Sequence, residues 1–309
     1  MRPRPEKDEL FSCWLVRLAW NNGEKLHPFC VRRLGVRWNV WGHDVDRLAP
    51  LDIIERAAIK TGIDIERVFS TTLAAFEGKI YERHVTKGVA QWIMPIGRYS
   101  RTRTLHGQQF CPWCLREDVV PYFRKSWRLA FVVTCERHGI VLSDDCPRCR
   151  APISYHEGDF GKDFLRDFCP LTLCPRCGWD LRIEISPAPI AESEIQKFQR
   201  KLSDAIGSRW IEVNAGRAIY CMSFFGGLHA LVRILSSNAY TKPIRDYLLA
   251  RDGFLPLPSG FPKKTNRFED LRVGDRYVVM RLLGQILSTW PRRLLRSVSR
   301  SASIQFLFA

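Results

Sequence analysis

The chain has 309 residues, and 46% of them are hydrophobic, which is enough for more than one compact core and excludes wholesale disorder. Its net charge of +16 favours a polyanionic partner such as nucleic acid or a ribonucleoprotein, although a basic protein without such a partner stays an alternative. The charged start MRPRPEKDELF has no apolar segment behind it, and no run of about 18 apolar residues follows. We therefore expect no membrane contact, a cytoplasmic location, and cysteines that bind metal rather than form disulfides.

Helical patterns dominate residues 8–75. The stretch DELFSCWLVRLAW begins with Asp8, a candidate N-cap, and then places Trp14, Leu15 and Leu18 on one apolar face. HPFCVRRLG has a proline near its start and a glycine at its end, as short helices often do.

Residues 53–72, IIERAAIKTGIDIERVFSTT, have the spacing of a helix-turn-helix unit. Ala58 is small where two helices would cross, Gly62 lies at the turn, and Val68 would anchor the second helix. An ordinary helical hairpin gives the same spacing. The second helix, DIERVFSTTLAAFEG, offers only Arg67 as a basic residue, so we do not expect it to read DNA.

Four pairs of metal-ligand type provide the strongest signal in the chain. Three are CPxC turns and one is CERH, and each spacing lets two ligands face the same ion. Tetrahedral zinc needs two such pairs, so the sequence predicts two zinc ions. The eight predicted ligands are Cys111, Cys114, Cys135, His138, Cys146, Cys149, Cys174 and Cys177.

Spacing alone does not fix how the four pairs combine. Sequential pairing joins the first pair with the second and the third with the fourth, and we favour it over a cross-braced order because it needs no interleaving. Cys169 is close enough to Cys174 to substitute for it but has no CxxC partner. Cys13, Cys30 and Cys221 lie in apolar helical patterns and are predicted to be buried.

Both zinc sites are predicted to be structural. A catalytic zinc ion keeps one position open for water, whereas here each ion has four protein ligands. HExxH, the deaminase pattern, phosphate-binding glycine loops and a nuclease-like carboxylate set are all missing from the sequence. We therefore predict a protein that is not an enzyme, with zinc replacing a large hydrophobic core in residues 110–182.

Several arginines are candidates for contact with nucleic acid or a partner. Each group has a simpler interpretation. The first three would lie in an exposed loop, and the last three on a solvated helix face. The two between them, Arg124 and Arg128, would be exposed while Tyr122 and Trp127 cover the zinc sites. The candidates are Arg98, Arg101, Arg103, Arg124, Arg128, Arg292, Arg293 and Arg296.

The expected fold class is mainly α with small zinc-ribbon or zinc-knuckle β elements. Residues 1–109 would form a helical, helix-turn-helix-like domain, and residues 110–185 a tandem zinc-finger domain. The proline-containing linker SPAPIAESEIQ, in which Ser193 starts a new helix, would lead into a helical domain over residues 186–309.

With these residues in place, the chain resembles the TniQ family. The resemblance begins at DELFSCWLVRLAWNNG, continues in WGHDVDRLAP, and is sharpest where CPxC, PYxRxxWR and CxxHxxxLxxxCPxC follow one another. It covers residues 7–182, and ILSTWPRRLL is similar to a helix near the C-terminus of longer members.

The resemblance implies a bacterial target-selection adaptor in DNA transposition, without catalytic activity and with structural zinc knuckles. Such adaptors join a target-recognising component to an AAA+ ATPase regulator. Members like TnsD bind a DNA site, whereas others dock on a CRISPR effector ribonucleoprotein, often as a homodimer. The rival interpretations are a zinc-containing, sequence-specific DNA-binding regulator with no ATPase partner and, more weakly, a zinc enzyme acting on nucleic acid.

Overall fold

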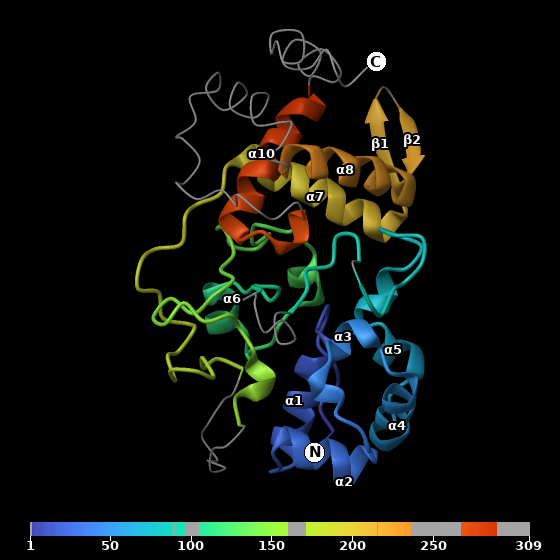
Figure 1. Cartoon of the computed structure of the whole chain (residues 1–309), viewed down its shortest axis with the longest axis vertical. Helices are drawn as coiled ribbons and strands as arrows, with labels where there is room; N and C mark the ends of the chain where they lie inside the picture. Colours follow the sequence, from blue (N-terminus) through green and yellow to red (C-terminus); the bar gives the residue numbers. More distant parts are fainter. Residues whose placement is uncertain are drawn as a thin grey trace.

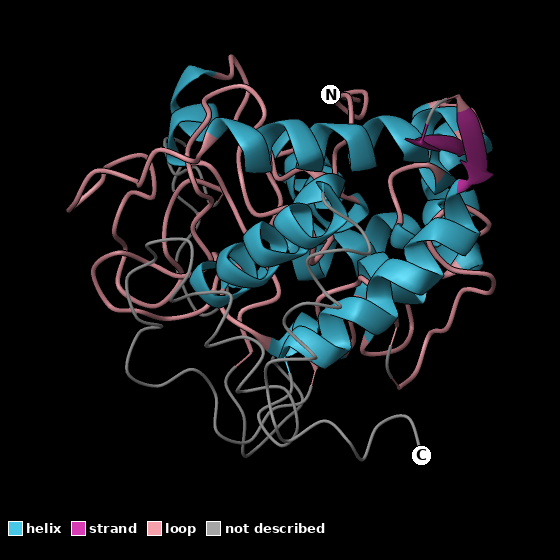
Figure 2. Cartoon of the chain, turned by 90° about the horizontal axis from the view of Figure 1, so that it is seen from above, coloured by secondary structure: helices cyan, strands magenta, loops and turns pink. Residues whose placement is uncertain are grey.

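The computed structural model describes residues 2–88, 90–96, 105–159, 171–214, 216–236 and 267–288. These residues are mainly helical, with one two-stranded sheet, as the sequence predicts (Figures 1 and 2). No helix among them is long and apolar enough to cross a membrane. The α-helices are α1 (Phe11–Asn21), α2 (Leu26–Leu34), α3 (Val45–Leu48), α4 (Leu51–Thr61), α5 (Ile65–Phe69), α6 (Pro112–Glu117), α7 (Ser193–Ser208), α8 (Cys221–Ser236) and α10 (Val273–Ser288). Short 3₁₀ turns are η1 (Val40–Gly42), η2 (Leu73–Phe76), η4 (Lys125–Arg128), η5 (Tyr155–Glu157) and η6 (Phe268–Asp270).

Helix α1 is buried on every side rather than along one apolar stripe. All of its residues from Phe11 to Ala19 are buried, as expected for a helix surrounded by other elements. The prediction that Asp8 caps it is wrong, because Leu10 occupies the N-cap position without a side-chain cap. Asp8 instead accepts a hydrogen bond from the backbone N–H of Ser126, at 3.2 Å.

The predicted second helix of the helix-turn-helix unit is much shorter than expected. Helix α4 ends at Gly62, whose φ of 71° allows the turn, but α5 covers only five residues before the chain changes direction. Arg67, its only basic residue, donates to the carbonyl oxygens of Pro5 and Glu6. The unit is therefore a compact helical corner, and its one candidate base-reading side chain is occupied within the molecule.

The two-stranded sheet lies in the C-terminal part of the chain and not in the cysteine-rich region. Strands β1 (Trp210–Asn214) and β2 (Arg217–Tyr220) pair antiparallel between α7 and α8, with an irregularity in register after Glu212. We did not predict this hairpin, although WIEVN and RAIY flank an Asn-Ala-Gly turn that is typical of one. In the described cysteine-rich residues, β structure is limited to isolated bridges such as Thr134 with Val141.

Residues 127–135 form a buried segment at the centre of the structure, and every side chain in it is buried. It pairs by backbone hydrogen bonds with residues 92–94, since Ala130 N–H donates to Trp92 at 2.7 Å and Met94 N–H donates to Arg128 at 3.1 Å. Side chains satisfy other backbone groups. Gln199 of α7 accepts from the N–H groups of Val133 and Thr134, at 2.8 and 2.9 Å.

Helix α10 reaches the same segment through a buried guanidinium group. Arg276 is fully buried and donates to the carbonyl oxygen of Ala130 at 2.8 Å and to the side chain of Gln109 at 3.0 Å. Burial lowers its pKa to about 10, so the group remains charged at neutral pH. Elements from both ends of the chain thus converge on residues 127–135.

Trp92 joins the N-terminal part of the chain to the C-terminal helices. Its indole makes edge-to-face contacts with Phe131, Phe225, His229 and Phe268, at centroid distances of 5.3 to 5.9 Å. Its backbone N–H donates to Glu269, which also pairs with His229 at 2.7 Å. This aromatic cluster fixes α8 and η6 against the central segment.

Arg128, predicted as a candidate contact or an exposed residue, is fully buried. Its guanidinium group forms an ion pair with Asp44 and donates to the carbonyl oxygen of Met94 at 2.8 Å. Asp46 lies 3.6 Å away and is also held by Ser12. Both interpretations of Arg128 were wrong, because the carboxylates that neutralise it come from a segment 84 residues earlier.

We expect Arg128→Met to lower the free energy of unfolding by about 3–5 kcal/mol, because the buried carboxylate of Asp46 and the partly buried carboxylate of Asp44 lose their cation. Burial, followed by the charge of Asp44, raises the pKa of Asp46 to about 6 in the folded protein. Because Arg128 lowers this pKa, its loss should raise the pKa further, so protonation stabilises the folded variant more than the folded parent and the deficit should shrink as pH falls toward about 6. Urea unfolding at about pH 7.5 and about pH 5.5 measures both effects.

Arg32→Met is the matched control, since Arg32 forms an ion pair with Glu24 but 66% of its side chain is exposed. Its substitution should change stability by less than about 1 kcal/mol. An equally small change for Arg128→Met would contradict the buried-pair interpretation.

Candidate metal centres

Three of the four ligand pairs lie on turns with the same backbone hydrogen bonds. In each, the N–H of the first cysteine donates to the carbonyl five residues later, at 2.8 to 2.9 Å. The carbonyl of that cysteine accepts from the N–H four residues later, again at 2.8 to 2.9 Å. The turns begin at Cys135, Cys146 and Cys174, and each is closed by an isolated β-bridge. These are the zinc-knuckle elements that the sequence predicts.

The residue that follows the second ligand has a left-handed backbone in all three turns. Gly139 and Gly178 supply it at φ of 65° and 71°, but the middle turn uses Arg150 at 57°. A residue with a Cβ in this conformation costs about 1 kcal/mol or more. Arg150 also pairs with Asp145 at 3.0 Å, which holds the turn from outside.

The remaining pair, Cys111 and Cys114, begins helix α6. Cys111 is the N-cap residue, followed by Pro112 at the first helical position, and Cys114 is one turn on. The sulfur of Cys111 accepts the N–H of Cys114 at 3.4 Å. The helix start therefore aims both sulfurs at the same point.

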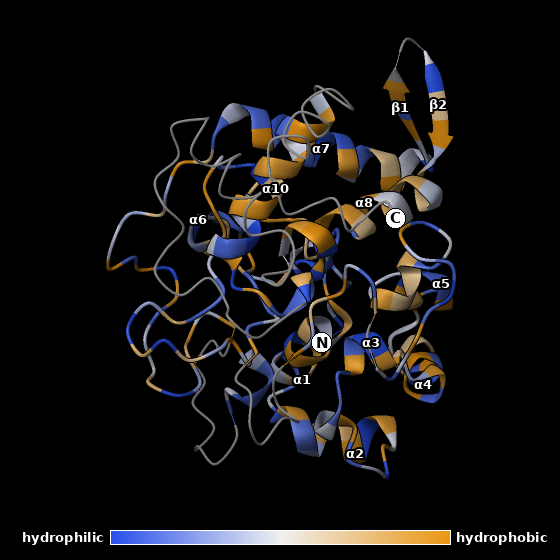
Figure 3. Ribbon diagram, turned by 45° about the horizontal axis from the view of Figure 1, so that its top comes forward, coloured by the Kyte–Doolittle hydropathy of each residue, from blue (hydrophilic) through white to orange (hydrophobic). Residues whose placement is uncertain are grey.

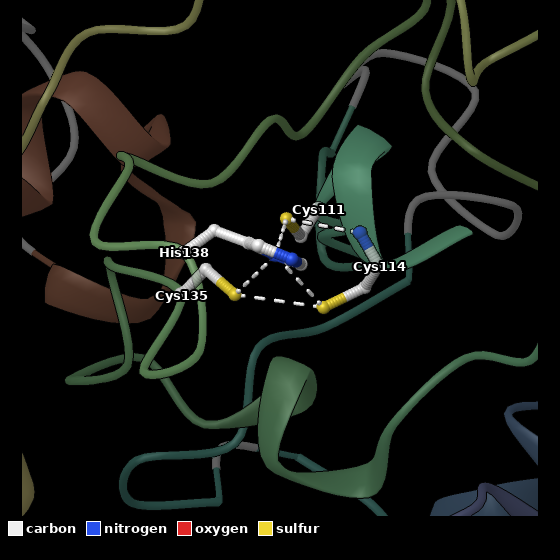
Figure 4. A group of neighbouring side chains, drawn as sticks. All are labelled: Cys111, Cys114, Cys135 and His138. Carbon is white, nitrogen blue, oxygen red and sulfur yellow. Dashed lines mark hydrogen bonds between the residues drawn. The ribbon is translucent and has the colours of Figure 1, made fainter. Parts of the chain in front are cut away.

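The structure brings Cys111, Cys114, Cys135 and His138 together (Figure 4). Nδ1 of His138 lies 3.3 to 3.4 Å from each of the three sulfurs, and the sulfurs of Cys114 and Cys135 are 3.5 Å apart. Ligand atoms on a tetrahedral zinc ion are separated by about 3.3–3.8 Å, given Zn–N and Zn–S bonds of about 2.0 and 2.3 Å. The arrangement fits one tetrahedral ion.

Charge also favours a cation in this cluster. Hydrogen bonds from the thiols of Cys111 and Cys114 hold the pKa of Cys135 well below its ordinary value. The hydrogen bonds of Cys114 with Cys111 and Cys135 raise the pKa of Cys114. One thiolate is thus favoured while its neighbours stay protonated, and three thiolates at this spacing require a divalent ion between them.

Glu117 and Trp113 position the histidine, and the sequence analysis missed both. Nε2 of His138 lies 2.9 Å from the Glu117 carboxylate, which fixes the proton on Nε2 and leaves Nδ1 free for the metal. The Trp113 ring packs edge-on against the imidazole at 5.6 Å and donates from Nε1 to Glu184. Glu117 lies three residues beyond Cys114, on the same short helix, and that proximity was the available signal.

The second cluster consists of Cys146, Cys149, Cys174 and Cys177. Its cross-turn sulfur distances are 3.6 Å between Cys146 and Cys177 and 3.7 Å between Cys149 and Cys174. These distances suit a tetrahedral ion with four thiolate ligands. Both clusters follow the sequential order of pairs.

The predicted covering role of Tyr122 and Trp127 differs from what the structure shows. Trp127 is buried against Phe123, and the guanidinium of Arg124 lies between the rings of Tyr122 and Trp127, 4.5 and 4.7 Å from their centroids. Arg124 also pairs with Asp118 at 2.9 Å. Its charge is therefore used inside the molecule.

Six predicted contact arginines lie outside the described residues, as does the substitute ligand Cys169. These arginines are Arg98, Arg101, Arg103, Arg292, Arg293 and Arg296. Cys13, Cys30 and Cys221 are buried, as predicted.

The third group of possible ligands is an ion-pair centre. His106, Asp144 and Asp145 approach one another, but Arg272 occupies the space with charge-paired contacts to both carboxylates. The guanidinium group supplies the positive charge that a metal would bring.

A family model described as TniQ matches residues 1–142, which include the first metal cluster. Over these residues the chain therefore resembles the TniQ family, a family associated with transposition. A search of curated proteins finds no match.

We expect the purified protein to contain about two zinc ions per chain. Replacing Cys146 and Cys177 together by serine should lower the content to about one, because the first cluster shares no ligand with the second. Elemental analysis by mass spectrometry measures this, with Cys30→Ala as the control that should retain both ions. A content unchanged by the double substitution would exclude the second site.

Glu117→Gln should weaken zinc binding at the first cluster by about 10- to 100-fold, because an amide holds the imidazole less strongly than a carboxylate. Competition with a chromophoric chelator measures the affinity in the Cys146→Ser/Cys177→Ser background, where only the first cluster remains. Glu136→Gln is the control, since Glu136 adjoins Cys135 but bonds to Ser203. Equal affinities for the two variants would remove the positioning role of Glu117.

Proposed function

We propose that this protein is a non-enzymatic target-selection adaptor in DNA transposition, linking a target-recognition module to an AAA+ ATPase regulator. The TniQ match over residues 1–142 is the observation that carries the proposal. The recognition module would be a DNA site or a CRISPR effector ribonucleoprotein, and the adaptor would act as a homodimer in the bacterial cytoplasm.

The two clusters support a structural role for the metal. Each offers four ligand atoms to one point, so an ion bound there has no open position for water or substrate. Five of the eight ligands are buried among apolar side chains. This favours an adaptor over a zinc enzyme.

The surface of α4 and α5 supports contact with protein more than with DNA. Ile59 and Ile65 are 78% and 44% exposed, and Glu66 lies beside Ile65 on the short helix α5. Exposed apolar side chains next to an acidic one suit a protein surface, whereas phosphates require cations. We place the ATPase here.

A DNA-binding regulator without an ATPase partner is the second candidate, and the net charge of +16 favours it. The two candidates differ in what the protein captures. An adaptor holds an ATPase after nucleic acid is removed, while a regulator retains only DNA.

Affinity purification of the tagged, full-length protein from its native host, with and without nuclease, tests the proposal. We expect an AAA+ ATPase in both samples and its loss from Ile59→Glu, with Ile234→Glu as the control because Ile234 is a 48% exposed residue of α8. Recovery of DNA alone, without an ATPase in either sample, would establish the regulator instead.

A further inference from the structure

A basic surface lies between α7 and the β1–β2 hairpin, outside the residues that match the TniQ family. Lys197, Arg200 and Lys201 are exposed on one face of α7, since they are spaced three and four residues apart. Together with Trp210 at the start of β1 they line an open depression of about 380 Å³. The hairpin stands out beyond the helices at one edge of the molecule (Figure 3).

The positive charge of this surface is only partly neutralised. Lys197 pairs with Glu194 at 2.8 Å, and Asp204 and Glu212 also line the depression. Arg200 and Lys201 form no ion pair with any carboxylate of the described chain. Arg209 at the end of α7 and Arg217 on β2 are also exposed and add two further cations.

Trp210 exposes an aromatic ring beside these cations. Trp210 is 56% exposed as a residue, although most tryptophans of folded proteins are largely buried. Tyr220, its cross-strand partner, contacts it at a centroid distance of 5.7 Å and an interplanar angle of 70°. Ser208 bonds to both the backbone N–H and the carbonyl of Trp210. The indole is thus held in place while part of its surface faces solvent.

We propose that α7 and the β1–β2 hairpin bind single-stranded nucleic acid. Arg200 and Lys201, with Lys197, would contact consecutive phosphates, and the indole of Trp210 would stack against an unpaired base. Cations next to an exposed aromatic ring are the features that bind single strands without sequence preference. The phosphates of duplex DNA can also pair with these cations, but its bases are stacked on one another, so no base face is available to the indole of Trp210. The proposal does not depend on the adaptor role.

Fluorescence anisotropy with the full-length, zinc-loaded protein tests it. The probes are a labelled oligothymidylate of about 20 nucleotides and a blunt duplex of the same length. We expect tighter binding of the single strand. Trp210→Leu should weaken that binding by at least about fivefold while Trp210→Phe retains it, because phenylalanine still stacks.

The salt dependence of single-strand binding is the slope of log affinity against log salt concentration. The double variant Arg200→Gln/Lys201→Gln should reduce the magnitude of this slope by about 1.4, because each lost phosphate contact removes about 0.7. Lys60→Gln with Arg83→Gln removes the same charge from exposed positions elsewhere and should leave the slope within about 0.3 of the parent value. Thermal melting checks that each variant is folded.

Three outcomes would overturn the proposal. They are no measurable binding of the single strand, equal loss in the control pair, and duplex binding as tight as single-strand binding with no effect of Trp210→Leu. The third outcome would show that the surface binds duplex DNA through its cations alone. If the protein binds no oligonucleotide but still captures the ATPase, the proposed single-strand site is wrong and the proposed adaptor function is unaffected.

Discussion

The structure depends on one constraint, which is that the polar backbone of the buried segment 127–135 must be satisfied without a regular sheet. Buried N–H and carbonyl groups that lack partners are costly, and here those partners come from distant parts of the chain. Residues 92–94 supply backbone groups, Gln199 of α7 supplies an amide, and Arg276 of α10 supplies a guanidinium. The segment therefore orders the helices around it, and the fold is held by specific polar contacts as much as by apolar packing.

The metal clusters hold together the residues that follow the buried segment 127–135 in the chain. This segment ends at Cys135, so the first cluster closes directly onto the centre of the protein. After the first cluster, most of the described cysteine-rich residues lie in turns and isolated bridges. Such elements contribute little to the stability of the fold by themselves. Four ligands on one ion can connect such turns where a sheet or helix bundle would otherwise be needed. Three of the four ligand pairs are presented by turns with the same backbone hydrogen bonds.

The sequence predicted what depends on neighbours in the chain and failed where distant residues decide. Ligand spacing within CxxC and apolar periodicity are both local properties, so the ligand pairs could be derived from the first and the helical class from the second. The burial of Arg128 could not, because it depends on Asp44, which is far away in the sequence. The role of Trp92 likewise requires knowing where α8 packs. The β1–β2 hairpin was missed for a different reason, since its turn signal is local and was outweighed by the surrounding helical patterns.

Trp92 lies within the family match but is enclosed by residues beyond its end. The match ends at residue 142, yet this indole, 50 residues earlier, is fully buried and is enclosed in part by Phe225 and Phe268. A fragment cut at the end of the match would expose a large aromatic surface together with the backbone N–H that Glu269 accepts. The matched residues therefore do not include all of the residues that enclose Trp92. The packing of the C-terminal helices therefore depends on a residue that lies within the matched region, which contacts their apolar side chains and the polar pair His229 and Glu269 alike.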